Sequence, residues 1–203
     1  GDRPMEPILE LKETVRRLEA ARNTESQIEL LQSLNDQLLT RFCVRLGEGI
    51  LLLPLWVEAY YYHPGSFEDS SAHLSPRQKD RFGRLYIHSK GYGGADICLS
   101  MGEYYLSCLL KYSLINGEFL SQLCLRDLLK ELCAKDPELG GRMVLSPLPD
   151  ELRDHRPVFH SPRRGLGEGK FRWARLASLK GVGEYPFRYE QRFGKTRLLN
   201  ERQ

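Results

Sequence analysis

The sequence lacks the features that mark a membrane or secreted protein. No apolar run approaches the roughly 20 residues that a membrane helix needs, because the longest, residues 49–57, is short and contains Pro54. No basic and then apolar signal segment opens the chain. We therefore expect no membrane partner and a cytoplasmic location.

Cysteine and histidine occur without the spacings that bind metals. The five cysteines are odd in number, form no CxxC pair and lie mostly in apolar runs. This pattern favours buried, reduced thiols over a disulfide framework. The five histidines form neither HxH nor HExxH, which disfavours a metalloenzyme. We expect no metal and no cofactor.

Charge is distributed unevenly along the chain. The net charge is only +3, but residues 155–203 contain twelve Lys or Arg against four Glu. A basic segment of this kind either contacts the phosphates of a nucleic acid or forms an ordinary solvated surface. Charge alone does not decide between these alternatives.

The first part of the chain has the pattern of two amphipathic helices. Apolar residues recur at helical spacing within residues 9–18 and again within residues 28–42. Thr24 and Gln27 predict a capping box at the start of the second helix. The first helix could be an arm or a dimer contact, but packing on the core is the more common outcome. We expect a monomer in which residues 1–45 form helices on the core.

From Gly49 the pattern changes to short apolar or alternating runs, which predict strands at residues 50–53, 55–61, 84–88, 95–100 and 104–112. Glycines at 91, 93 and 94 predict a hairpin with a flexible tip. Residues 120–132 have helical spacing and the helix should end near Gly140 and Gly141, before an irregular connector at 147–169. The tail, residues 172–199, is expected to form one or two strands around residues 186–189.

These elements predict an α+β fold in a single domain. We expect a curved antiparallel β-sheet with a protruding hairpin, flanked by α-helices. Residues 46–203 should form the mixed core and the basic C-terminal region. The length of 203 residues with 41% hydrophobic content is enough for one sizeable core.

A carboxylate among aromatic residues is the first candidate for chemistry. Period-2 alternation places Glu58, Tyr60 and Tyr62 on one face of a strand. If this face lines a cleft, the aromatic rings desolvate Glu58 and raise its pKa, as suits a general base. The alternative, which the strand alone favours, is an exposed glutamate on an edge strand. His73 would position water only with a partner carboxylate such as Glu58.

The order of motifs around these residues resembles the alkyladenine (3-methyladenine) DNA glycosylases. That family has Glu-Ala-Tyr, an acidic loop, a histidine, Thr-Pro-Arg and a Leu-Tyr-Val strand. The corresponding residues here are Glu58-Ala59-Tyr60, Asp69, Ala72-His73, Ser75-Pro76-Arg77, Phe82-Gly83 and Leu85-Tyr86-Ile87. The resemblance covers residues 56–117, with a weaker similarity at Pro186-Phe187-Arg188-Tyr189.

The resemblance implies hydrolytic excision of a damaged purine that is flipped out of duplex DNA. Glu58 matches the general base, while Tyr60 and His73 match residues that sandwich the base or contact the attacking water. Lys111 stands at the position of an arginine near that water. It keeps the charge but loses the planar fork.

Several substrate-binding positions differ from the family. His88 replaces a second stacking tyrosine, and Cys98 replaces an asparagine that contacts the base. Gly91 stands at the position of a tyrosine wedge, but the adjacent Tyr92 can serve. Asp96 is either a second functional carboxylate or a buried partner of His88 or Lys111. The DNA-contacting basic face is expected to include Lys90, Arg163, Arg164 and Arg172.

Three functions follow as hypotheses. The first is a DNA glycosylase acting on alkylated or deaminated purines. The second is a non-catalytic relative that binds nucleic acid or another partner. The third is an enzyme that acts on a different glycosidic substrate with Glu58 and Asp96 as a carboxylate pair.

Overall fold

A computed structural model describes residues 5–47, 49–153 and 155–181, and within them ten strands form one antiparallel sheet. The helices are α1 (Pro7–Ala20), α2 (Thr24–Arg41), α3 (Gln122–Lys135) and α4 (Leu139–Arg142). The strands are β1 (Phe42–Arg45), β2 (Leu51–His63), β3 (Phe67–Glu68), β4 (Leu85–Ile87), β5 (Ala95–Cys98), β6 (Tyr105–Ile115), β7 (Glu118–Ser121), β8 (Val144–Pro147), β9 (Val158–Ser161) and β10 (Ala177–Lys180).

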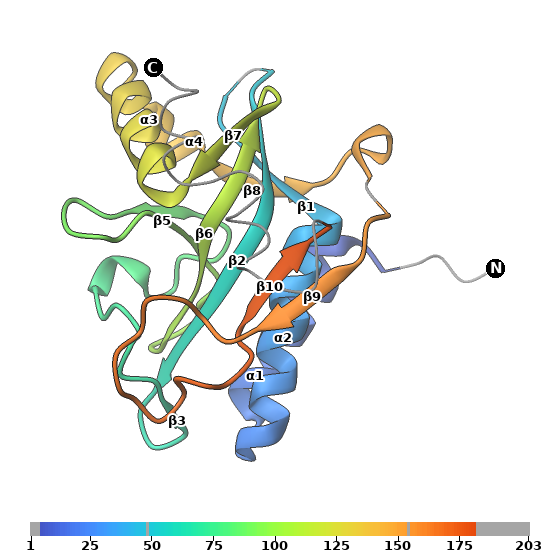
Figure 1. The fold of residues 1–203 in the computed structure, drawn as a ribbon, viewed down its shortest axis with the longest axis vertical. Coiled ribbons are helices and arrows are strands. Elements are labelled where there is room, and N and C mark those ends of the chain that lie inside the picture. Colours follow the sequence, from blue (N-terminus) through green and yellow to red (C-terminus); the bar gives the residue numbers. More distant parts are fainter. Residues whose placement is uncertain (1–4, 48, 154, 182–203) are drawn as a thin grey trace.

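The sheet is curled like half of a barrel, with helices at its sides (Figure 1). Its main order is β4-β5-β6-β2-β1-β8, and β10, which also pairs with β9, lies beside β2. The β4–β5 hairpin protrudes at one edge, and α1 and α2 cover one face. The predicted α+β fold is therefore confirmed.

Helices α1 and α2 pack on the sheet through their apolar stripes. Pro7 opens α1, where its missing N–H costs nothing, and Leu11, Val15 and Leu18 are fully buried. The predicted capping box of α2 is wrong by one residue, because the side chain of Asn23 accepts from Ser26 N. Gln27 is buried instead and donates to Ala21 O and to Ser66 Oγ.

The two strands predicted at residues 50–53 and 55–61 are one long strand, β2. Its register with β6 shifts on both sides of Trp56, next to Pro54, which has no N–H to donate to a ladder. The predicted strands at residues 84–88, 95–100 and 104–112 are present as β4, β5 and β6. Strand β2 is flanked by β6 on one side and by β1 and β10 on the other, so its middle lies inside the sheet.

Several boundaries differ from the prediction. Phe42 begins β1 and does not extend α2. Asn116 and Gly117, both with positive φ, form the two-residue turn between β6 and β7, and strand β7 was not predicted. Helix α3 ends at Lys135, and the glycines at 140 and 141 lie in α4. The connector at 147–169 contains β9. The strand expected around residues 186–189 lies outside the described residues.

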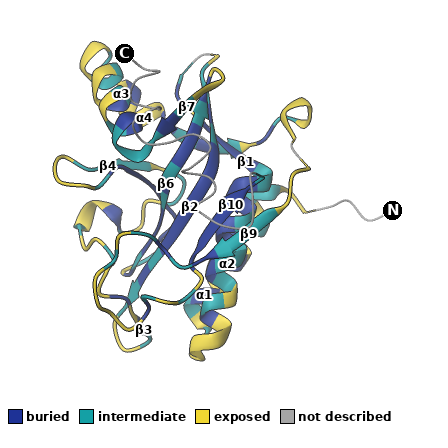
Figure 2. Ribbon diagram, viewed as in Figure 1, coloured by how far each residue is buried: buried dark blue, intermediate teal, exposed yellow. Residues whose placement is uncertain are grey.

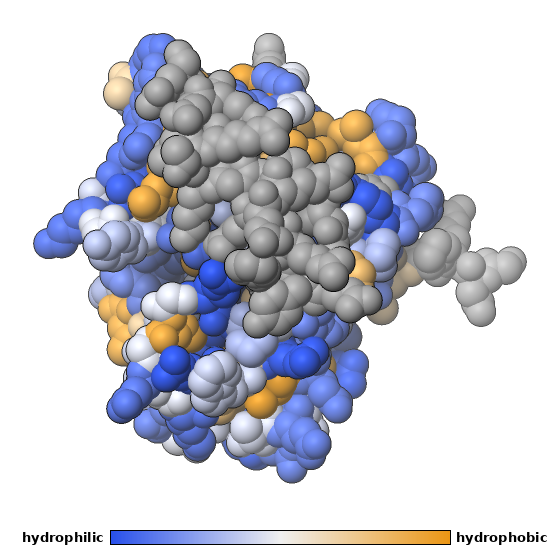
Figure 3. Space-filling model, viewed as in Figure 1, coloured by the Kyte–Doolittle hydropathy of each residue, from blue (hydrophilic) through white to orange (hydrophobic). Residues whose placement is uncertain are grey.

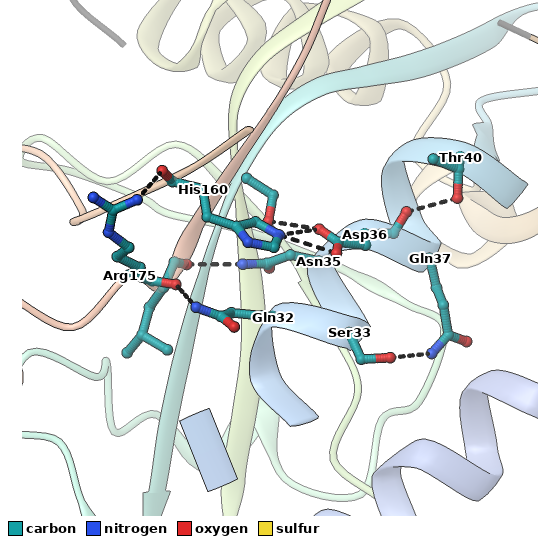
Figure 4. A network of polar contacts seen from close by, with 10 residues as sticks. Gln32, Ser33, Asn35, Asp36, Gln37, Thr40, His160 and Arg175 are labelled. Carbon is teal, nitrogen blue, oxygen red and sulfur yellow. Dashed lines mark hydrogen bonds and ion pairs between the residues drawn. The ribbon is translucent and has the colours of Figure 1, made fainter. Parts of the chain in front are cut away.

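A polar face of α2 fixes the β9–β10 hairpin in place (Figure 4). The carboxylate of Asp36 contacts His160 Nε2 at 2.8 and 3.0 Å and accepts from Ser178 Oγ at 2.9 Å. Asn35 Nδ2 donates to Leu176 O at 2.8 Å, and Gln32 Nε2 to Arg175 O at 2.9 Å. Polar side chains of α2 therefore hold both ends of the loop at residues 162–176 in place.

Burial is concentrated where the sheet meets the helices (Figure 2). The central parts of β2, β6 and β10 are buried, and the exposed residues lie mostly in loops and on outer helix faces. Among the described residues, none of the helices combines the length and the apolar character needed to cross a membrane.

We predict that truncating one buried side chain of α1 destabilises the whole protein. Leu18 is 0% exposed and Leu9, on the same helix, is 50% exposed. Leu18→Ala should lower the free energy of unfolding by about 2–5 kcal/mol, whereas Leu9→Ala should change it by less than about 0.5 kcal/mol. Urea denaturation of both variants measures this, and equal effects would show that α1 does not belong to the core.

Candidate active site

A cavity of about 210 Å³ opens on the face of the sheet where Glu58 and Tyr60 of β2 lie. Strand β6 contributes alternate residues to the same face, and loops and the β4–β5 hairpin complete the wall. The lining residues are Glu58, Tyr60, Ser71, His73, His88, Tyr92, Gly93, Asp96, Ser107, Leu109, Lys111, Gln122, Arg164, Gly165 and Leu166.

The carboxylate of Glu58 is held inside this cavity wall. The residue is 0% exposed, because Leu109 of β6 and Ala177 of β10 flank it across the sheet. Its Oε2 accepts from Arg164 N at 2.9 Å and its Oε1 from the Tyr60 hydroxyl at 3.3 Å. The alternative of an exposed edge-strand glutamate is therefore wrong, and the predicted face shared with Tyr60 is confirmed.

Burial raises the pKa of Glu58 above its ordinary value. The positive charge of Lys111 and the hydrogen bond from Arg164 N oppose this effect of burial. Lys111 lines the same cavity, and its Nζ lies 5.9 Å from the centroid of the Trp56 ring. Glu58 and Lys111, both predicted to be catalytic, are thus brought to one site.

A buried ion pair supports the loop that contacts Glu58. Arg163 Nη1 and Nη2 lie 2.5 and 3.3 Å from the carboxylate oxygens of Asp69, and Nη1 also donates to Ala59 O. Both side chains are almost fully buried. Because the guanidinium also lies 4.5 Å from the Tyr60 ring centroid, it fixes Arg164 and Tyr60, the two donors to Glu58. The prediction that Arg163 contacts DNA is therefore wrong.

Rings of three residues pack together along another part of the cavity wall. The centroids of His73 and His88 are 4.7 Å apart, and Tyr86 lies 5.4 Å from the first and 5.0 Å from the second. His73 Nε2 is 3.2 Å from the Tyr86 hydroxyl. Burial and the neighbouring His88 lower the pKa of His73, which favours a neutral ring at neutral pH.

Asp96 is fixed by two neighbours. Its Oδ2 lies 2.8 Å from His88 Nε2 and accepts from Gln78 Nε2 at 2.8 Å. The sequence left Asp96 as either a second functional carboxylate or a buried partner of His88 or Lys111. These contacts match a buried partner of His88. Glu58 and His73 line one cavity, but their hydrogen-bond partners are different.

Cys98 does not join the cavity lining. It is 1% exposed on β5, and burial raises the pKa of its thiol to about 12. The prediction that Cys98 contacts a substrate is not supported, because this buried residue is not among those that line the cavity.

The tip of the β4–β5 hairpin, which was predicted to be flexible, is attached to α3 by side-chain hydrogen bonds. Arg126 Nη1 donates to the carbonyl oxygens of Gly91 and Gly93 at 2.7 and 2.8 Å. Gln122 Nε2 donates to Tyr92 O, and Lys130 Nζ to Ser89 O, each at 2.8 Å. A Cβ on Gly93 would lie 2.4 Å from the His88 ring, so the close approach requires glycine.

These contacts leave the side chain of Tyr92 at the edge of the cavity. The residue is 88% exposed although it belongs to the lining. Of the residues predicted to contact DNA, Lys90 is exposed beside this tip, Arg164 lines the cavity, and Arg172 is partly exposed on the loop at 162–176.

Sequence reasoning missed several parts of the site. Ser107 and Gln122 line the cavity, and Tyr86 supports His73 from behind. Alternation along β6 from Lys111 could have indicated Ser107. Nothing local indicates Gln122, because it reaches the cavity from the start of α3.

The chain matches no protein-family model, and no curated protein is significantly similar to it. Within the described part of the chain, no three His, Cys, Asp or Glu residues are grouped so that they could hold a metal ion. The chemistry of the site must therefore be argued from its own residues.

We predict that Glu58 makes the protein less stable as pH rises. A raised pKa means that the unfolded chain ionises first, near the ordinary value of about 4.3, and the folded state only at higher pH. Above about pH 4.3 the wild type therefore loses stability relative to Glu58→Gln, until pH passes the folded-state pKa. The Gln amide can still accept from Arg164 N and donate to the Tyr60 hydroxyl.

Melting curves of wild type and Glu58→Gln between pH 4 and 8 measure this difference. The matched control is Glu103→Gln, since the Glu103 side chain is 88% exposed. A stability difference between wild type and Glu58→Gln that does not change with pH, or that shifts in favour of wild type as pH rises above about 4.3, would contradict the prediction.

Proposed function

We propose that the protein hydrolyses the N-glycosidic bond of a purine nucleotide in DNA, with Glu58 as the general base. The observation that carries this proposal is a buried carboxylate in a small cavity walled by Tyr60, His73 and His88. The resemblance of residues 56–117 to the alkyladenine DNA glycosylases suggests the same reaction. Damaged purines, alkylated or deaminated, are the proposed substrates.

The size and lining of the cavity suit a single base. Pockets for drug-sized ligands measure about 300–1,000 Å³, and this cavity of about 210 Å³ is smaller. The rings of Tyr60, His73 and His88 offer surfaces on which a planar base can stack. A base can enter such a cavity only when its nucleotide is flipped out of the duplex.

The surroundings of Glu58 suit water activation. Its raised pKa makes the carboxylate a better proton acceptor, while Lys111 favours the ionised form that must accept the proton. The ionised carboxylate also stabilises the positive charge that develops on the sugar in an oxocarbenium-like transition state. Tyr60 and Arg164 N orient the carboxylate by donating to it.

DNA is the proposed partner, and the basic residues around the cavity support it. Lys90, Arg164 and Arg172 are placed on segments that border the cavity, and the terminal region is rich in Lys and Arg. We propose that the protein acts as a monomer in the cytoplasm. All five cysteines are free thiols, as suits a reducing compartment.

Binding without catalysis is the competing function. It is favoured by the observation that both Glu58 oxygens already accept hydrogen bonds from the protein. A carboxylate pair formed by Glu58 and Asp96 is disfavoured, because Asp96 is already engaged by His88 and Gln78.

We predict that Glu58→Gln lowers the single-turnover rate of base excision by roughly 10²–10⁴-fold, the usual contribution of a general base. Duplex binding should change little, because the amide keeps the shape of the side chain. The assay uses duplexes that contain hypoxanthine or ethenoadenine, and strand cleavage at the abasic product measures excision.

Glu103→Gln serves as the matched control and should excise at the wild-type rate, since Glu103 is exposed and is not among the residues that line the cavity. Equal rates for wild type and Glu58→Gln would remove Glu58 from the mechanism. A wild type that binds these duplexes without excising any base would support the competing function.

A further inference from the structure

Two aromatic side chains are the most exposed large hydrophobic ones among the described residues, and both belong to segments that contribute to the cavity lining. Tyr92 is 88% exposed and Trp173 is 74% exposed, more than any other large hydrophobic residue there. Tyr92 lines the cavity. Trp173 belongs to the loop at residues 162–176, which lines the cavity with Arg164, Gly165 and Leu166. The exposure of Trp173 is the feature that the proposed reaction does not use.

Trp173 is exposed on a turn that is held in place. Next to it, Phe171 is buried and stacks on Phe67 with ring centroids 4.0 Å apart and an interplanar angle of 13°. Arg172 N donates to Gly169 O and Ala174 N to Phe171 O. The loop is therefore anchored on one side of Trp173, while the indole extends into solvent.

This turn begins next to the cavity wall. Gly169 lies beside Ser70, because a Cβ on Gly169 would be 3.5 Å from Ser70 Oγ. Ser71, the residue after Ser70, lines the cavity. Trp173 is seven residues beyond Leu166, so the chain can separate the two by at most roughly 25 Å. At about 3.4 Å per nucleotide along one duplex strand, about seven nucleotides cover such a distance.

The surroundings of Trp173 are basic. The Arg172 guanidinium lies 4.7 Å from the centroid of the indole, and Lys170 is exposed on the same turn. In the view of Figure 3, hydrophobic residues outside the grey region form separate patches among hydrophilic ones. An aromatic ring beside cations suits a ligand that has both a planar base and a phosphate, and nucleic acids combine the two.

We propose that the turn at residues 169–174 is a second nucleic-acid contact outside the cavity, where Trp173 stacks on an unpaired base and Lys170 and Arg172 face phosphates. The proposal rests on the proposed function in taking nucleic acid as the partner. It adds a substrate preference, because the bases of an intact duplex have no free face for stacking. Nucleic acid with unpaired nucleotides beside the one in the cavity should bind more tightly than a fully paired duplex.

The two tryptophans of the chain allow a direct test. Trp56 is 0% exposed and Trp173 is 74% exposed, so stacking of a base on Trp173 should quench the exposed part of the fluorescence. We expect a single-stranded DNA 12-mer to quench wild-type emission strongly and the matched duplex to quench it weakly. In Trp173→Phe, which leaves only Trp56 as a reporter, the quench should disappear while binding persists.

Affinity provides the second measurement. Trp173→Ala should weaken binding of the labelled 12-mer by about 5- to 150-fold, the range expected for one stacked base, and Trp173→Phe should weaken it much less. Leu152→Ala, another exposed hydrophobic position, is the control and should bind as wild type. Absence of quenching by the single strand, or equal affinity of Trp173→Ala and wild type, would overturn the proposal and leave a protein partner as the explanation for this surface.

Failure of the second contact and failure of the catalytic proposal would give different results. Glu58→Gln should show the full quench, because Glu58 is not part of the turn. Quenching by a protein that excises no base would support the second contact and contradict the catalytic proposal. Excision without quenching would support the catalytic proposal and contradict the second contact.

Discussion

The site depends on the burial of one carboxylate in the middle of a β-sheet. An ionised group is costly to bury unless it is hydrogen-bonded or paired, and Glu58 receives two donors, Tyr60 and Arg164 N. The Arg163 guanidinium packs on the Tyr60 ring, and Arg164 is the next residue in the chain. The charge of Arg163 is in turn paired with Asp69. Breaking this pair would leave an unpaired buried charge, which is far more costly than removing a surface ion pair.

The helices contribute to the site without lining most of it. Helix α2 fixes the start and end of the loop at 162–176 through Asp36 and Asn35, and this loop brings Arg164 to Glu58. Helix α3 fixes the hairpin tip through Arg126 and neighbouring polar side chains. The two segments that border the cavity are therefore held in place by separate helices, through contacts within the protein. Preorganisation of this kind lowers the cost of binding.

Local patterns predicted the parts of the structure that depend on local rules. Alternation along β2 placed Glu58 and Tyr60 on one face, and three glycines marked the β4–β5 hairpin. Strand β1 was missed because it follows α2 directly, so Phe42 was read as part of the helical stripe, and β9 was missed because it lies in a connector without a clear period. The role of Arg163 was predicted wrongly because its partner Asp69 is 94 residues away, and no local signal separates a buried arginine from an exposed one.

The most direct test of a carboxylate prepared for proton transfer is the pKa of Glu58 itself. Carbon-detected NMR of protein labelled at the glutamate carboxyl carbons follows each side chain through a pH titration, and Glu58→Gln assigns the resonance. The burial of Glu58 predicts one glutamate that titrates clearly above the ordinary value of about 4.3 and whose signal is missing in the variant. A resonance of Glu58 that titrates at or below that value would contradict the account.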